Sequence, residues 1–168
     1  MNLQFFIEKL QDSDEFKEFI EKHSDAFLAS CFFVIDVAKP NNEEEKKYHL
    51  DYFIPSEKRM VAFELEKGIK QSDVELYGRE EVPSKLKAIS ELEFDEIKSM
   101  IWERMQKESV NKELQKIIMS LQNVNGRDVF VCTVFVSGLG IVRCWIDDEN
   151  KEITEFEKKS FFDFMRKA

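Results

Sequence analysis

The stretch from Val129 to Asp147, VFVCTVFVSGLGIVRCWID, predicts a β-hairpin that turns at SGLG. Pairing Val136 with Gly140 across a three-residue loop separates two kinds of side chain. Thr133, Arg143 and Asp147 then share one face, and the opposite face is apolar, with Phe130, Cys132, Val134, Val136, Val142, Cys144 and Ile146. This separation favours the register over a one-residue slip, which would mix the two faces.

Outside the hairpin, the spacing of apolar residues predicts both helices and strands. Helices are expected over residues 2–23, strands over 27–66, a long helical segment over 94–123 and a C-terminal helix over 160–167, while residues 67–90 show no clear period. This order predicts one α+β domain over residues 1–168, because strands that follow each other in sequence pair antiparallel. The expected architecture is an antiparallel sheet of about five strands with helices on one face.

The composition restricts the classes of partner. The chain has 168 residues and a net charge of −9, with 43% hydrophobic and 35% charged residues. This suits a globular domain with a substantial core, and the acidic balance argues against binding the phosphate backbone of a nucleic acid. The longest apolar runs are shorter than the roughly 20 residues that a transmembrane helix needs, and the N-terminal residues do not resemble an export signal. We therefore expect a cytoplasmic protein that binds neither nucleic acid nor a membrane.

The hairpin and the turn after it show a family resemblance. The segment of residues 129–153 resembles the hairpin of PepSY-type modules, in which a strand with an aromatic start leads to a second strand that ends in an acidic turn. Asp147, Glu152 and Ile153 match the end of that pattern. The order of elements is also similar to cystatin-like folds. The resemblance implies a binding or inhibitory module without catalysis, and it assigns no functional residue.

Catalytic candidates are few. The sequence lacks the local motifs of phosphate-binding loops, nucleophile elbows and zinc-binding helices. Of the two histidines, His23 ends a predicted helix, where a cation complements the helix dipole. His49 shares a strand face with Asp51, and a hairpin would bring Asp36 near both, so the three could hold a divalent metal or act as acid and base. A solvated polar face explains the same pattern, and we expect neither a metal nor another cofactor there.

Two cysteines face each other in the predicted hairpin. Cys132 and Cys144 are directly opposite, and a non-hydrogen-bonded antiparallel pair brings Cβ atoms to about 4.5–5.5 Å. Since this approaches disulfide geometry, the two form a candidate redox pair. The alternative is two small apolar side chains that stay reduced in the core, which a cytoplasmic location favours.

Aromatic side chains on the predicted sheet are the candidate binding residues. Tyr48, Tyr52, Trp145 and Arg143 are the expected contacts for a ligand or partner. The predicted function is a non-catalytic interaction or regulatory module that binds a protein or peptide through this aromatic sheet face. Its partner would be a dedicated protein or, as a homodimer, a second copy of the chain. The alternative is a pocket between the sheet and the long helix, for a small apolar ligand or an unrecognised reaction.

Overall fold

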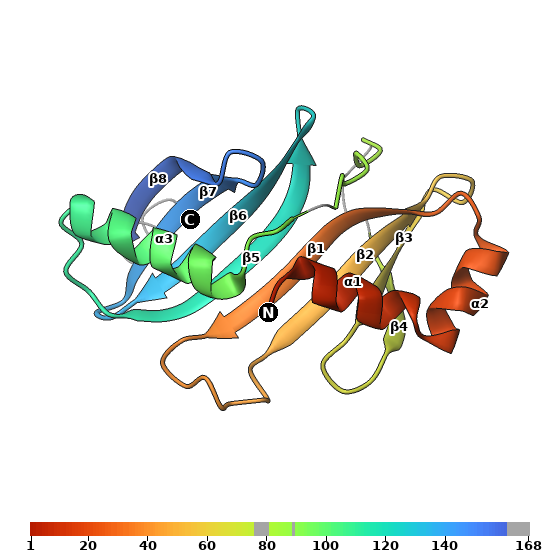
Figure 1. Ribbon diagram of the computed structural model, residues 1–168, viewed down its shortest axis with the longest axis horizontal. Coiled ribbons are helices and arrows are strands. Elements are labelled where there is room, and N and C mark those ends of the chain that lie inside the picture. Colours follow the sequence, from red (N-terminus) through yellow and green to blue (C-terminus); the bar gives the residue numbers. More distant parts are fainter. Residues whose placement is uncertain (76–80, 89, 161–168) are drawn as a thin grey trace.

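Eight strands form one antiparallel sheet in the computed structural model, which describes residues 1–75, 81–88 and 90–160. The strand order is β4-β3-β2-β1-β5-β6-β7-β8 (Figure 1). The elements are α1 (Leu3–Gln11), α2 (Asp14–Lys22), β1 (Phe27–Asp36), β2 (Lys47–Ile54), β3 (Arg59–Glu64), β4 (Lys70–Val74), α3 (Phe94–Lys107), β5 (Leu114–Val124), β6 (Arg127–Val136), β7 (Gly140–Asp147) and β8 (Glu152–Ser160).

The second half of the chain repeats the element order of the first. Helices α1 and α2 precede the meander β1 to β4, and α3 precedes the meander β5 to β8. At the centre of the sheet β1 pairs antiparallel with β5, with Phe33 opposite Met119. The two meanders therefore extend from this pair in opposite directions. Figure 1 shows α1 and α2 in front of one meander and α3 in front of the other.

The core lies between the helices and the sheet. The helices bury apolar stripes, Leu3, Phe6, Ile7 and Leu10 on α1 and Phe94, Ile97, Ile101 and Met105 on α3. The ring of Phe6 joins the two halves, because its centroid lies 5.4 Å from that of Phe33, 4.7 Å from that of Tyr48 and 5.9 Å from that of Phe94. The aromatic cluster thus links α1 to both a central strand and the start of α3.

Polar contacts also tie the first turn of α1 to the first turn of α3. The Phe94 amide donates to the Met1 carbonyl oxygen at 2.9 Å, and Asn2 Nδ2 donates to Glu93 Oε1 at 2.9 Å. Glu93 also forms a capping box with Glu96, which satisfies amides at the start of α3. The two helices therefore begin side by side above the centre of the sheet.

The predicted hairpin register is confirmed. Val136 pairs with Gly140, and Cys132 pairs with Cys144. The apolar face of the hairpin is buried in the core, with Phe130 and Cys144 both at 0% exposure. A Cβ atom on Gly140 would lie 2.6 Å from Val136 Cγ2, so the close approach of the two strands at this turn requires glycine.

The prediction of about five strands is wrong, and the cystatin-like or PepSY-like architecture is corrected with it, because the described residues contain eight strands in one sheet. One missed strand, β4, lies inside residues 67–90. It is a polar edge strand with the sequence KQSDV, so it has no apolar alternation that sequence reasoning could detect. Strand β8, which the sequence indicates only as a short strand at Ile153, extends from Glu152 to Ser160. The predicted helix over residues 160–167 lies outside the described residues from position 161 on.

The predicted helical segment over residues 94–123 is a helix followed by a strand. Helix α3 ends at Lys107, Ser109 adopts a positive φ of 58°, and β5 begins at Leu114. Apolar residues over 114–124 fit both a helical and a strand period. Residues 114–124 form a strand because β1 and β6 pair with them on both sides, along most of their length. The fully buried residues alternate as in a strand: Ile117, Met119 and Leu121.

Candidate functional site

The face of the sheet opposite the helices carries apolar side chains on four adjacent strands. In one row, Phe32, Ser120, Val131 and Trp145 are successive partners on β1, β5, β6 and β7. Residues directly opposite in antiparallel strands share a face, and residues two positions away do so as well. The apolar members of this row and of the next two rows are called the open-face patch: Phe32, Val34, Ile118, Val131, Phe135, Ile141 and Trp145.

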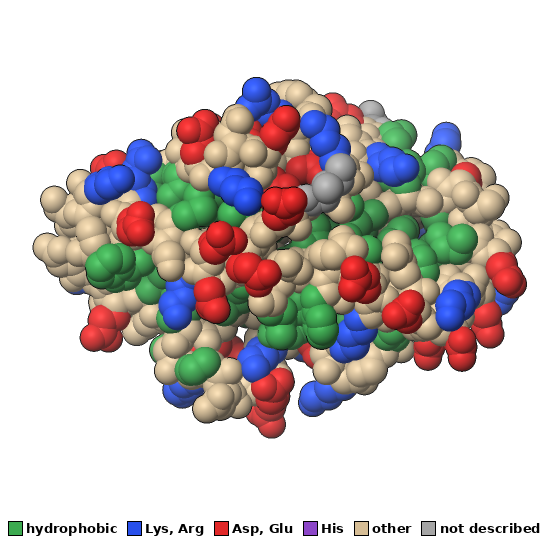
Figure 2. Space-filling view, in the orientation of Figure 1, with side chains coloured by type: hydrophobic (Ala, Val, Ile, Leu, Met, Phe, Trp, Pro, Cys, Tyr) green, Lys and Arg blue, Asp and Glu red, His purple; other side chains and the backbone are tan. Residues whose placement is uncertain are grey.

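The open-face patch is separate from the core. Its side chains belong to neither hydrophobic core cluster, and all except the buried Val34 are partly exposed. The described helices lie on the other side of the sheet (Figure 1). That helix side, shown in Figure 2, is a mosaic in which charged side chains of both signs interrupt the hydrophobic areas. Its exposed aromatic side chains, Phe5 and Trp102, stand on two different helices.

The structure separates the predicted binding residues into two groups. Trp145 and Arg143 lie on the open face of β7. Tyr48 and Tyr52 do not share this face, because they have the same parity on β2 as Leu50, which pairs with the core residue Cys31. Burial beneath the helices also raises the pKa of Tyr52 well above its usual value. The structure therefore places neither tyrosine beside Trp145 and Arg143: Tyr52 is buried in the core, and Tyr48 packs against the core while partly exposed.

A small polar cluster borders the patch at β2. His49 Nδ1 lies 3.0 Å from Asp51 Oδ1, Ser30 Oγ donates to Asp51 Oδ2 at 2.8 Å, and the His49 ring stacks on Phe32 with 4.6 Å between centroids. Asp51 is buried, so it holds the imidazole in one orientation. Ser30 and His49 bind different oxygens of the same carboxylate, so the Ser30 hydroxyl donates to Asp51 and not to the imidazole, unlike a serine nucleophile paired with histidine.

Asp36, the third residue of the metal site that the sequence left as an alternative, does not lie with His49 and Asp51. Asp36 Oδ1 accepts the Lys39 amide at 2.8 Å, at the far end of β1 from Ser30. Within residues 1–75, 81–88 and 90–160, no group of three or more His, Cys, Asp and Glu side chains is placed to hold a metal ion. His23 ends α2 as its C-cap residue and pairs with Glu57 at 2.9 Å, as the helix-end prediction requires.

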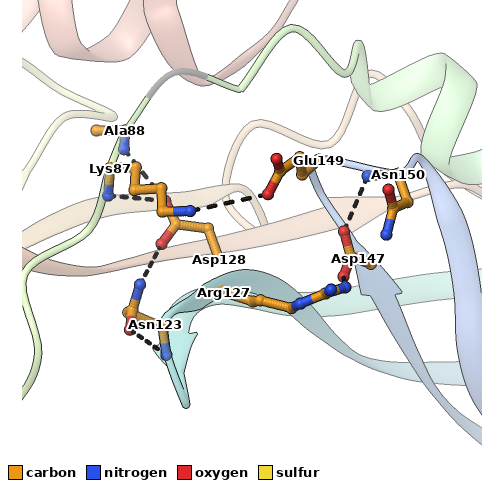
Figure 3. A network of polar contacts seen from close by, with 9 residues as sticks. Lys87, Ala88, Asn123, Arg127, Asp128, Asp147, Glu149 and Asn150 are labelled. Carbon is orange, nitrogen blue, oxygen red and sulfur yellow. Dashed lines mark hydrogen bonds and ion pairs between the residues drawn. The ribbon is translucent and has the colours of Figure 1, made fainter.

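A second polar cluster, at the β5–β6 turn, holds the connection between the two halves (Figure 3). Asp128 is 6% exposed and accepts the Lys87 amide at 2.9 Å, the Ala88 amide at 3.2 Å and Asn123 Nδ2 at 2.8 Å. Lys87 and Ala88 belong to the crossover segment, residues 81–88 and 90–93, which leads from β4 to α3. Two of these bonds fasten the crossover segment to the start of β6, and the third joins β6 to Asn123 on β5.

The β7–β8 turn completes this cluster with two adjacent carboxylates. Asp147 accepts the Asn150 amide at 2.9 Å and Arg127 Nη1 at 2.8 Å, and these donors lower its pKa. Asp148 accepts the Ser90 hydroxyl at 2.6 Å, but burial raises its pKa, and repulsion from neighbouring carboxylates acts in the same direction. A hollow of about 310 Å³ lies between the turn and the crossover segment, lined by Lys87, Glu91, Asp128, Asp148, Glu149 and Lys151.

The contacts of this cluster hold segments of the chain together. Its buried carboxylates all have protein donors, and two ion pairs cross the rim of the hollow, Lys87 to Glu149 at 3.8 Å and Lys151 to Glu91 at 3.6 Å. Sequence reasoning missed Asp128 and the Ser90–Asp148 contact, because the contributing segments lie far apart in the chain. The turn sequences NVNGRD and DDEN were the only local signal.

The two turn carboxylates give a pH prediction. Asp148→Asn is expected to raise the melting temperature at about pH 7, and Asp147→Asn to lower it, each by about 2–4 °C. The folded pKa of Asp148 lies above its unfolded value, so its charge destabilises the fold at neutral pH and this penalty disappears as the pH falls through the folded pKa. Stabilisation by Asp147 is present above the unfolded pKa and is lost as the pH falls through its lowered folded pKa.

Melting curves of the two variants and the unmodified chain at about pH 7 and about pH 3 test these signs. The advantage of Asp148→Asn should shrink at the lower pH, where the natural carboxyl is protonated. A lower melting temperature for Asp148→Asn at neutral pH would contradict the prediction.

Comparisons with known proteins identify a similar fold. No protein-family model matches the chain, and no curated protein matches it. A solved structure from Clostridium difficile 630, described as a "putative lipoprotein", has a TM-score of 0.55 and 11% sequence identity, over 87% of this chain and 91% of that one. At this identity the likeness concerns the fold alone. In the described part of this chain, no helix is long and apolar enough to span a bilayer.

Proposed function

We propose that the protein is a non-catalytic binding module that holds a protein partner on the open-face patch. The observation that carries this proposal is the set of seven apolar side chains over β1, β5, β6 and β7, with Ser120, Thr133 and Arg143 between them, on the face that the described helices leave uncovered. Apolar side chains that gather outside the core over several adjacent strands are typical of interaction sites.

The dimensions and the composition of the patch suit the centre of an interface. Four strands are about 14 Å across and three rows of residues are about 13 Å long, so the patch matches the central part of a standard protein interface. Phe32 and Trp145 are the large aromatic members, and residues of these types supply most binding energy in interfaces. His49 borders Phe32 at one edge of the patch, and Arg143 lies within the patch, between Trp145 and Ile141 on β7. Arginine is itself enriched in protein interfaces.

The alternative of a pocket beneath the long helix has less support. Ile97, Ile101 and Met105 project from α3 toward the sheet and are each 0% exposed. Packed side chains therefore occupy the space where a small apolar ligand would have to bind.

Site-specific photocrosslinking tests the proposal. A benzophenone amino acid at position 145 is expected to crosslink a protein in extracts of the source cell, with loss of the product when excess unmodified chain competes. The matched control is the same group at position 102, where Trp102 is 53% exposed on the helix side. The same crosslinking with the purified chain alone shows whether the partner is a second copy of the chain, because only a second copy can then give a product. Equal products from the two positions, or none from position 145, would refute the proposal.

A point substitution at Trp145 tests the contribution of this side chain to partner binding. Trp145→Glu should weaken binding to the captured partner by at least about tenfold, because burying a carboxylate in an apolar interface centre is unfavourable. Trp102→Glu should leave the affinity unchanged. Circular dichroism of both variants verifies that each is folded.

A further inference from the structure

Cys132 and Cys144 are nearest neighbours on adjacent strands. They are directly opposite in the β6–β7 register, and both side chains lie on the core face, with exposures of 1% and 0%. All three cysteines of the chain are described, and none is bridged in this structure. The open-face patch lies on the other side of the sheet, so this pair is independent of the proposed binding surface.

The backbone geometry at this pair suits a disulfide. Directly opposite residues in antiparallel strands have Cα atoms about 4.5 Å apart at non-hydrogen-bonded positions and about 5.5 Å apart at hydrogen-bonded ones. Both values lie within the range of about 4.4–6.8 Å that natural disulfides span. The two side chains point to the same side of the sheet, with Cβ atoms about 4.5–5.5 Å apart in a regular pair. A bond between the sulfur atoms therefore requires rotation of the side chains and an approach of the strands by up to about 1 Å.

The strand order keeps the third cysteine, Cys31, from forming a disulfide with Cys132. Cys31 lies on β1, where its partners are Leu50 on one side and Leu121 on the other. Strand β5 separates it from Cys132, which places the two cysteines about 10 Å apart across the sheet.

We propose that Cys132 and Cys144 form a cross-strand disulfide when the chain folds in the presence of a disulfide donor, such as oxidised glutathione. The thiolate of one cysteine attacks the donor disulfide, forms a mixed disulfide and releases one donor thiol. The thiolate of the other cysteine then attacks the protein sulfur of this mixed disulfide and releases the second donor thiol. Two cysteine thiols lose their protons and are oxidised by two electrons, and the donor disulfide is reduced to two thiols.

Whether the disulfide forms depends on whether oxidation comes before or after folding. In the folded protein both sulfur atoms are buried, and the neighbouring Cys144 thiol and burial raise the pKa of Cys132 well above its usual value. A donor the size of glutathione cannot reach them, and little thiolate exists to attack it. Oxidation must therefore precede burial of the hairpin, so the same chain yields a reduced or a bridged protein according to the compartment in which it folds.

Refolding from denaturant tests the proposal. The reduced chain is unfolded in guanidinium chloride and refolded with reduced and oxidised glutathione, and a parallel sample of native reduced chain receives the same buffer. Intact mass should show the loss of two hydrogen atoms in the refolded sample, and a peptide map should join Cys132 to Cys144. The native sample should oxidise at least about tenfold more slowly. The bridged protein should melt about 5–10 °C higher, because the bond constrains the unfolded chain.

Two variants control for the identity of the pair. Cys31→Ser should form the same bridge with unchanged yield, and Cys144→Ser should form none. Three free thiols after refolding of the natural chain, or a bridge that includes Cys31, would overturn the proposal. Should Cys144→Ser fail to fold, the peptide maps of the natural chain and of Cys31→Ser still decide the question.

Discussion

Asp128→Ala is expected to lower the free energy of unfolding by about 3 kcal/mol. The carboxylate of Asp128 is 6% exposed and accepts the amides of Lys87 and Ala88 together with the side-chain amide of Asn123. Alanine leaves these donors without their acceptor, and each unsatisfied buried donor costs about 1–3 kcal/mol. Because Lys87 and Ala88 lie in the crossover segment, the loss should detach that segment from β6.

Two measurements check this expectation. Urea unfolding gives the change in free energy, and hydrogen exchange should show faster exchange at the amides of Lys87 and Ala88 in the variant. The control is Glu91→Ala, which removes only a surface ion pair to Lys151 at 3.6 Å and should change stability by less than about 0.5 kcal/mol. Equal stabilities for the two variants would show that Asp128 does not fasten the crossover segment.

The sequence predicted the structure correctly where the local pattern of apolar and polar residues allows only one strand register. In the β6–β7 hairpin, a single register segregates apolar from polar side chains, so the pairing of Cys132 with Cys144 followed directly. Strand β2 is the opposite case, because Asp51, Tyr52 and Phe53 are all buried. A strand covered on both faces carries no alternation, and its tyrosines could not be assigned to a face without knowing which residues of β1 they oppose.

The same physical limit explains the errors in element type. The apolar residues from Leu114 to Leu121 fit the helical period and the strand period equally. Pairing with the two neighbouring strands, β1 and β6, selects the strand. Strand β4 is polar because it lies at the edge of the sheet, so its existence depends on an adjacent strand rather than on its own residues. Asp128 was missed because the two backbone amides that it binds, those of Lys87 and Ala88, lie about 40 residues away in the chain.

Phe6→Ala should produce the largest loss of stability, about 3–5 kcal/mol. The Phe6 ring is 2% exposed, and it contacts Phe33 and Tyr48 in the first half of the chain and Phe94 at the start of α3. Alanine would leave a cavity where the two halves meet above the central strands, and the surrounding rings belong to three different elements, β1, β2 and α3, that cannot all move inward together.

The neighbouring residue supplies a matched control. Phe5 is on the same turn of α1 and loses the same atoms on replacement by alanine, but it is 51% exposed. Phe5→Ala should therefore change the free energy of unfolding by no more than about 1 kcal/mol. Urea unfolding of the two variants, followed by both circular dichroism and tryptophan fluorescence, measures the difference. A loss for Phe6→Ala no larger than that for Phe5→Ala would contradict the assignment of Phe6 as the residue that packs both halves of the molecule together.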